Sequence, residues 1–564
     1  MLGTLTSGQK PCLLLIGIDG ADYHITDRLM GQGYLPNLKA LAERGAWGPV
    51  RSTVPPLTPP AWTTLMTGKN PGKHGVFDFL PMDGQDPGVP VGARRRATTL
   101  WRALSDLGYR VGTLNLPVTY PPEPISGFQV SGFTAPAFGP AVAYPKRAFS
   151  VLRQAAQGFA PFPDPSGHPG EGERELRDRI DLVPIATRHL LQAFPCDVYM
   201  VNFQVVDWVQ HRALPEEMKP GDAGSLDLDG LVARTYRLVD DRVGVVLREW
   251  ASPQTHVMVT SDHGAAVVDR LVNLERLFLE EGLLFYKSAT TGKSSGLAAA
   301  RLRARVALGL WNALKRNAPR LAGRLAPLAR RLRAGVSAYQ ADVEVDWSRT
   351  QAAPWGLYGQ VRLNIRGRDP EGIVPPHEAP ALKARVRELI LSVRDPVSGE
   401  PVYRDVSEGP AIYSGPFVPE GPDLVALPAD ERYLTVCGRM FGGPRLPLLD
   451  AQDQTVVALD PPRDFHSCLG IFGLAGPGVE PGKHLPESSL ADFVPTALYL
   501  LGEPVPSDMD GRPVMEAMRS ETPRKRRVRV CMPWPEPEAQ DRRVVYTKQE
   551  EKQVQEQLEA LGYL

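Results

Sequence analysis

Carboxylate and imidazole side chains recur in this sequence directly after short apolar runs. Residues 13–18 form one such run, and residues 197–203 and 256–261 form two more. A continuous apolar run is typical of a strand that is buried on both faces of a parallel sheet. The polar residues that follow these three runs are Asp19, Asp207, His211, Asp262 and His263. Because ligands gather at the carboxyl ends of such strands, these side chains are candidates for one site.

The spacing of these residues constrains their local structure. Asp207 and His211 are four positions apart, which places both on one face of a helix. Asp262 and His263 are adjacent, so they need a non-helical strand end, and the glycine that follows them allows it. His466 precedes the last apolar run. Taken singly, an Asp-His pair is more often a surface hydrogen bond than a ligand set, and a lone loop histidine is more often structural.

One hydroxyl stands out among the candidate nucleophiles. Prolines flank Thr58 on both sides and restrict the backbone there, and a helical pattern follows. The Thr58 hydroxyl is therefore expected near a helix N-terminus, which favours anion binding. Thr63, Thr64 and Thr67 are rival hydroxyls, but they lie inside the expected helix.

The elements that must position these residues alternate between strand and helix. Further strands are expected at 48–53, 111–117, 360–367, 423–427 and 470–479, and helices at 35–45, 99–109, 229–250, 377–395 and 489–502. This alternation predicts an α/β fold with a doubly wound, mostly parallel sheet and helices on both faces. Residues 121–172 are rich in Pro, Gly and Phe and are expected to form a surface excursion near the site.

Three sequence blocks together resemble one superfamily. They are Gly17-Ile18-Asp19-Gly20, Leu57-Thr58-Pro59-Pro60 and the segment 67–76, Thr-Gly-Lys-Asn-Pro-Gly-Lys-His-Gly-Val. The chain resembles the alkaline phosphatase superfamily. Within it the likeness is to type I phosphodiesterases and nucleotide pyrophosphatases, and to bacterial proteins described as phosphohydrolases or phosphomutases.

The resemblance implies a two-metal site. One metal would be held by Asp19, Asp262 and His263, with Thr58 beside it. The other metal would be held by Asp207, His211 and His466. These donors include no thiolate, which suits zinc, and manganese or iron also fits them. The implied chemistry is attack by Thr58 on phosphorus through a covalent phosphothreonine intermediate, which water then releases.

The chain departs from nucleotide pyrophosphatases at one substrate contact. Those enzymes carry an Asp-Asn pair whose amide donates to a phosphoryl oxygen, and the matching positions here are Asp78 and Phe79. Phe79 has no donor, so a backbone N–H, Lys69 or Lys73 would have to replace it. Lys69, Lys73 and His74 have an alternative role as loop and packing residues.

The implied substrate is a small phosphodiester or a nucleotide-like pyrophosphate. Trp62 and Phe77 could stack on a base, although aromatic residues more often pack in the core. Two alternatives stay open, namely a metal-dependent phosphomutase of the same superfamily and an inactive docking protein. A sulfatase is less favoured because the motif around Thr58 lacks the sulfatase pattern.

Composition limits the range of partners. The chain has 64 basic and 64 acidic residues among 564, so it has no global charge footprint for nucleic acid. Its 5 cysteines are scattered and have no CxxC spacing, which argues against a disulfide framework and fits a reducing cytosol. No apolar run approaches the length of about 20 residues that a membrane span needs. These features predict a cytoplasmic protein, and they leave its oligomeric state open.

The expected domain organisation has four parts. Residues 11–285 and 345–515 form the catalytic core, 286–344 a basic helical insertion, 516–546 a linker and 547–564 a C-terminal helix that docks through its apolar positions. Residues 301–333 contain ten Lys or Arg and no acidic residue, with leucines at helical spacing. This segment either packs its leucines on the core or forms a cationic cap that attracts anionic substrates or an anionic membrane surface.

Overall fold

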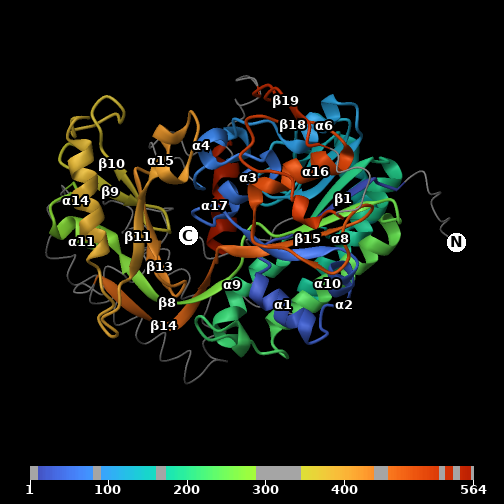
Figure 1. The fold of residues 1–564 in the computed structure, drawn as a ribbon, viewed down its shortest axis with the longest axis horizontal. Coiled ribbons are helices and arrows are strands. Elements are labelled where there is room, and N and C mark those ends of the chain that lie inside the picture. The colour runs from blue at the N-terminus through green and yellow to red at the C-terminus, as the bar shows by residue number, and fades with distance from the viewer. Residues whose placement is uncertain are drawn as a thin grey trace.

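A central sheet organises the computed structural model of the chain (Figure 1). The structure describes residues 10–79, 91–159, 173–287, 345–436, 455–519, 527–537 and 546–560. The central sheet has ten strands in the order β16-β2-β15-β7-β1-β6-β3-β4-β5, with β17 also paired to β2. The bounds of these strands are β1 Leu13–Ile18, β2 Ala46–Arg51, β3 Val111–Leu116, β4 Gly127–Ser131, β5 Ala143–Tyr144, β6 Val198–Phe203, β7 His256–Thr260, β15 Leu469–Ala475, β16 Lys483–His484 and β17 Ser488–Ser489.

The first strand lies at the centre and sets the position of the site. β1 pairs in parallel with β6 on one side and with β7 on the other. Ile18 is opposite Phe203, and Gly17 is opposite Thr260. The residues that follow the three strands therefore emerge at one edge of the sheet, as the sequence predicts.

Two hydrophobic clusters cover the two faces of this sheet. Leu14, Ile16 and Ile18 belong to one cluster, whereas Leu13 and Leu15 belong to the other. Alternate side chains of a strand point to opposite faces, so β1 is buried on both sides. The predicted doubly wound, mostly parallel sheet is confirmed, although β15 runs antiparallel to both β2 and β7.

Helices supply the layers on both faces. α1 Tyr23–Gly31, α2 Pro36–Glu43, α8 Glu173–Ala193, α9 Val205–Glu217 and α10 Leu231–Trp250 contribute to the first cluster. α3 Thr58–Thr67, α6 Leu100–Asp106 and α16 Phe493–Leu501 contribute to the second. The remaining described α-helices are α4 Pro71–His74, α5 Val91–Arg94, α7 Lys146–Ala155, α11 Leu274–Glu280, α14 Ala379–Leu391, α15 Gly409–Ile412 and α17 Lys548–Ala560.

The excursion expected at 121–172 is only partly a loop. Its described part contains β4 and β5, which extend the central sheet, and helix α7. The prediction of a surface excursion is therefore wrong for these residues. Five- and two-residue strands are too short to produce a clear apolar period between Pro and Gly. Residues 160–172 lie outside the described part.

The strands expected at 360–367 and 423–427 do not join the central sheet. They form β10 Gln360–Leu363 and β12 Leu424–Pro428 of a second, four-stranded antiparallel sheet in the order β11-β12-β10-β9. The other two strands are β9 Ala352–Trp355 and β11 Tyr403–Glu408. Figure 1 draws this sheet beside α14, to the left of the central sheet. The expectation that these strands continue the central sheet is therefore wrong. The residue pattern within a strand does not show with which other strand it pairs.

A three-stranded sheet in the order β13-β8-β14 lies between the other two in Figure 1. Its strands are β8 Ala266–Asn273, β13 Tyr433–Val436 and β14 Val456–Phe465. β8 begins shortly after His263, and β14 ends directly before His466. Two candidate ligands are therefore attached to strands of this sheet.

The C-terminal helix docks on the core. α17 buries Leu558 in the first cluster, and Val554 packs against it, as the sequence predicts. Gln557 Nε2 donates to the carbonyl of Ala135 at 2.9 Å. Leu561 lies outside the described residues, and so does the basic insertion from residue 288 to 344. Within the expected linker, β19 Val530–Cys531 pairs with β18 Val505–Pro506. None of the helices in the described ranges is long and apolar enough to cross a membrane.

Candidate metal centre

Thr58 is the first residue of helix α3 and is completely buried. Its position at the N-terminus matches the sequence prediction. Its hydroxyl oxygen lies 3.4 Å from Nε2 of His263. The rival hydroxyls of Thr63 and Thr67 donate to carbonyls one turn earlier in the same helix, and Thr64 contacts His74. Among the helix's threonines, Thr58 is thus the one that contacts a candidate metal ligand.

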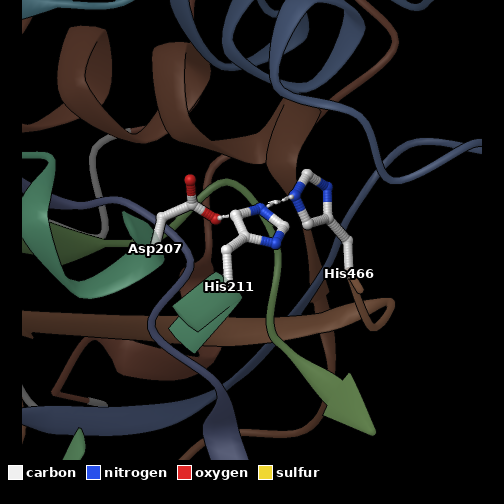
Figure 2. Close-up of side chains that lie close together, drawn as sticks. All are labelled: Asp207, His211 and His466. Carbon is white, nitrogen blue, oxygen red and sulfur yellow. Dashed lines mark hydrogen bonds and ion pairs between the residues drawn. The ribbon is translucent and has the colours of Figure 1, made fainter. Parts of the chain in front are cut away.

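Asp207 and His211 of α9 and His466 after β14 form one group of candidate ligands, and Figure 2 shows that their side chains lie close together. Nε2 of His211 lies 3.3 Å from Oδ1 of Asp207 and 3.3 Å from Nε2 of His466. Nε2 of His466 lies 3.6 Å from the same carboxylate oxygen. The helical spacing of Asp207 and His211 brings both to one face of α9, as predicted. These three residues could hold a metal ion.

A second group adjoins the first through Asp207. Ligand atoms of Asp19, Asp207 and His263 all lie within 4.8 Å of one another. Asp262, which the resemblance assigns to this group, is also adjacent, since its Oδ2 lies 3.2 Å from Nε2 of His263. The rings of His263 and His466 stack with centroids 3.5 Å apart. The structure therefore brings all seven predicted residues together, and Asp207 stands between the two groups.

The other ring nitrogen of each histidine has an acceptor. Nδ1 of His263 faces the carbonyl of Gly264 at 2.9 Å, and Nδ1 of His466 faces the carbonyl of Pro56 at 2.8 Å. A carbonyl can only accept, so Nδ1 carries the hydrogen, and in the neutral ring Nε2 is the nitrogen that can bind a metal. Each Nε2 atom faces the carboxylates, which is the orientation that a metal ligand requires.

His211 differs because its Nδ1 contacts a side chain. Oδ2 of Asp464 lies 2.9 Å from this atom, and both side chains are buried. Sequence reasoning missed Asp464, although it lies only two positions before His466. A carboxylate close to a candidate ligand in the chain is a signal, but it does not identify which histidine the carboxylate contacts.

Burial controls the electrostatics of the site. Burial first, and then the charges of Asp262 and Asp207, raise the pKa of Asp19 well above its usual value. Burial and Asp207 raise the pKa of Asp262 in the same way. Burial also acts to raise the pKa of Asp207, but contact with His211 and His466 keeps that pKa below its usual value. Burial opposes protonation of His211, yet Asp207 and Asp464 raise its pKa to about 10.

Two carboxylate oxygens in the site are left without hydrogen bonds. Oδ1 of Asp19 and Oδ2 of Asp262 are buried and have no hydrogen-bond partner among the described residues. A buried carboxylate oxygen without a donor is costly unless a cation stabilises it. The donor set of carboxylates and imidazoles therefore fits divalent metal ions, which supply that charge.

The aromatic residues considered for base stacking have structural positions. Trp62 is fully buried in the second cluster, and its Nε1 donates to Oδ2 of Asp19 at 2.8 Å. The ring of Phe77 packs edge-on against Tyr413 at 5.2 Å between centroids. Neither side chain is exposed to a ligand, so the alternative of core packing is the one that the structure favours.

The basic candidates are engaged in ion pairs. Lys69 pairs with Asp508, and Lys73 pairs with Asp510 at 2.6 Å. These contacts attach the start of α4 to the segment that follows α16. His74 is buried, and its Nε2 contacts the hydroxyl of Thr64 at 3.0 Å. All three residues are thus accounted for by packing and loop contacts.

The chain is similar in sequence to one protein family and in structure to several solved proteins. The sequence profile of the type I phosphodiesterase/nucleotide pyrophosphatase family matches residues 13–439. Phosphonoacetate hydrolase from Sinorhizobium meliloti 1021, solved with phosphonoformate, is similar in structure at 15% identity and a TM-score of 0.50, over 87% of this chain and 95% of that one. Murine ectonucleotide pyrophosphatase/phosphodiesterase 5 is similar at 12% identity and a TM-score of 0.47, over 90% and 100% of the two chains. A search of curated protein sequences finds no match.

The chain belongs to the type I phosphodiesterase/nucleotide pyrophosphatase family, because the family profile covers most of its length. It is therefore a phosphoester hydrolase of the alkaline phosphatase superfamily. The family is dependent on divalent metals, and the two Asp/His groups are candidate sites for them.

Proposed function

We propose that this enzyme cleaves phosphodiester or nucleotide-like pyrophosphate bonds by means of two divalent metals, with Thr58 as its nucleophile. The observation that supports this most directly is the position of Thr58. Its hydroxyl begins helix α3 and lies 3.4 Å from Nε2 of His263, within the same buried group of side chains as both sets of candidate ligands. A helix N-terminus favours the negative charge of a phosphoryl group.

The candidate ligands are assigned to two metal ions. Asp19, Asp262 and His263 would hold one metal beside Thr58, and Asp207, His211 and His466 would hold the other. When bound, two such cations lower the pKa of an adjacent hydroxyl and stabilise charge on the phosphoryl oxygens. Zinc is the proposed metal, because the donors are carboxylates and imidazoles without thiolate.

The reaction then proceeds in two displacements. The Thr58 oxygen attacks phosphorus and loses its proton, the bond from phosphorus to the leaving oxygen breaks, and the leaving oxygen takes up that proton. The product of this step is a phosphothreonine ester on the enzyme. Water attacks the same phosphorus in the second step, the bond from phosphorus to the Thr58 oxygen breaks, and a proton from the water restores the hydroxyl. A buried site excludes bulk water from the first step.

Substitution of Thr58 tests the nucleophile. Thr58→Ala is expected to lower kcat by about a thousandfold or more, because the attacking oxygen is absent. Metal content measured by elemental analysis should stay near that of wild type, since six other ligands remain. Thr63→Ala is the matched control, because Thr63 lies in the same helix and its hydroxyl bonds only a helix carbonyl among the described residues. Full activity in Thr58→Ala would remove Thr58 from the mechanism.

A substrate panel tests the bond that is cleaved. Comparison of kcat/KM for aryl phosphodiesters and aryl phosphomonoesters should favour the diesters. The alternative of a phosphomutase predicts instead that a sugar phosphate is isomerised without release of phosphate. An inactive docking protein is disfavoured, because the candidate ligand set is intact and the chain belongs to a family of hydrolases.

We further propose a cytoplasmic location, which rests on the scattered cysteines. Among the residues that the structure describes, Cys12, Cys196, Cys468 and Cys531 form no disulfide bond. Contact of the basic segment 301–333 with an anionic membrane surface is a separate proposal. Co-sedimentation with anionic and with neutral liposomes tests it, and equal binding to both would contradict it.

A further inference from the structure

The three candidate histidine ligands are oriented by different kinds of acceptor. His263 and His466 each donate Nδ1–H to a backbone carbonyl, at 2.9 and 2.8 Å. A side-chain substitution cannot remove those acceptors. His211 alone of the three has a carboxylate there, because Oδ2 of Asp464 lies 2.9 Å from its Nδ1. The orientation of His211 thus depends on a residue that can be changed.

Asp464 comes from a different element than His211. It is the penultimate residue of β14, paired with Val267 of β8, and its side chain is only 1% exposed. His211 lies on α9, which packs against β14. The contact therefore joins a helix of the central fold to a strand of the three-stranded sheet, at the site itself.

Asp464 has little other role in hydrogen bonding. Its Oδ1 is buried and has no hydrogen-bond partner among the described residues. By contrast, the buried carboxylate of Asp240 accepts bonds from two backbone N–H groups and one amide, at the N-terminus of α2. A carboxylate that is buried for structural reasons normally has such donors. The geometry of Asp464 is that of a residue whose buried charge serves one imidazole.

We propose that Asp464 is a positioning residue for the metal centre, which orients His211 and strengthens its Nε2 as a ligand. This inference rests on the proposed metal sites. With Nδ1–H donated to Asp464, Nε2 of His211 faces Asp207 and His466 at 3.3 Å from each, and there a metal ion would take the place of a proton on Nε2. A carboxylate acceptor also increases the electron density on the imidazole, and its negative charge favours a nearby cation.

Zinc affinity is the measurement that tests this role. Asp464→Asn keeps the shape of the side chain and an oxygen acceptor but removes the charge. It is expected to raise the zinc Kd of the full-length protein by about 10- to 100-fold, measured by competition with a chromophoric chelator. Excess zinc should then restore kcat, because the defect is in occupancy. Asp240→Asn is the control, since it alters a buried carboxylate outside the metal site and should leave the zinc Kd unchanged.

A double-mutant cycle separates positioning from a general structural role. In a His211→Ala background, Asp464→Asn should change the zinc Kd by less than about twofold, because the residue through which it acts is absent. If Asp464→Asn does not fold, Asp464→Ser takes its place in both backgrounds.

Two results would overturn the inference. A folded Asp464→Asn protein that binds zinc as tightly as wild type would do so, and so would an equal loss of affinity with and without His211. A wild-type protein that binds no zinc or other divalent metal would instead overturn the proposed function, and the inference with it. A wild-type protein that binds zinc tightly but does not cleave phosphodiesters would contradict only the substrate assignment.

Discussion

Individual buried ionisable residues fall into two kinds in this protein. Asp240 and His74 have polar partners for their buried atoms, so their burial stabilises the fold. Asp19, Asp262 and Asp464 each leave one buried oxygen without a hydrogen bond among the described residues. Because an unpaired buried oxygen is unfavourable for folding, the second kind indicates residues that are retained for another purpose. All three lie in or beside the candidate metal centre.

His74 leads to a prediction about pH. Its Nδ1 accepts from the backbone N–H of Val76, and burial, with the positive charges of Arg95 and Lys69, keeps its pKa well below the usual value. The unfolded chain binds a proton at His74 near pH 6.5, whereas the folded chain does not, so stability falls as pH falls through that value.

Urea unfolding of wild type and His74→Gln measures this effect. The stability advantage of wild type should shrink by about 1.4 kcal/mol between about pH 7.5 and 5.5, because glutamine does not titrate. A difference between the two proteins that is the same at both pH values would contradict a neutral, buried His74.

Elements from distant parts of the chain cooperate at the site. The central sheet supplies the strand ends before Asp19, Asp207 and Asp262, while the three-stranded sheet supplies the strand end before His466. Tyr358, from the loop between β9 and β10, donates to the carbonyl of His466 at 3.2 Å. The second sheet is therefore in contact with the centre through its hairpin loop.

The C-terminal helix gives a prediction at the scale of elements. Leu558 of α17 is 6% exposed and packs in the first cluster. Leu558→Ala should lower the free energy of unfolding by about 2 to 4 kcal/mol, because it leaves a cavity there. Lys552→Ala is the control on the exposed side of the same helix and should change it by less than about 0.5 kcal/mol. Denaturant unfolding measures both effects. A loss for Leu558→Ala as small as that for Lys552→Ala would mean that packing of α17 on the core does not stabilise the fold.

At the scale of the whole molecule, the fold brings three carboxylates close together in one buried site. Asp19, Asp207 and Asp262 are each at most 2% exposed. Like charges in a low-dielectric interior repel one another, so bound cations are expected to stabilise the folded state by offsetting that repulsion. The stability of the entire protein should thus be linked to metal binding.

Removal of metal tests this linkage. Treatment with a chelator should lower Tm by several degrees, since free metal at about 1,000 times its Kd contributes about 4 kcal/mol to stability. Addition of zinc to the chelated protein should restore Tm. The His211→Ala variant should show a smaller shift than wild type, because it has already lost a ligand. An unchanged Tm on chelation of a metal-loaded protein would contradict the linkage.

The local structure around the candidate site residues was predictable from the sequence, because it depends on residue type and local period, whereas their roles as metal ligands and nucleophile came from the resemblance to the superfamily. The run before Asp19 indicates a buried strand, the spacing of Asp207 and His211 indicates a helix face, and the prolines around Thr58 indicate a helix start. Each of these signals lies within a few residues of the side chain that it positions.

Tertiary structure decided which of these elements meet. Periodicity could not assign β10 and β12 to a second sheet, because a strand pattern is the same whichever strand it pairs with. Nor could it reveal that Asp464 faces His211 or that Asp207 stands between both ligand groups. Those contacts join residues far apart in the chain, and the packing of helices and sheets around a common core sets their distances.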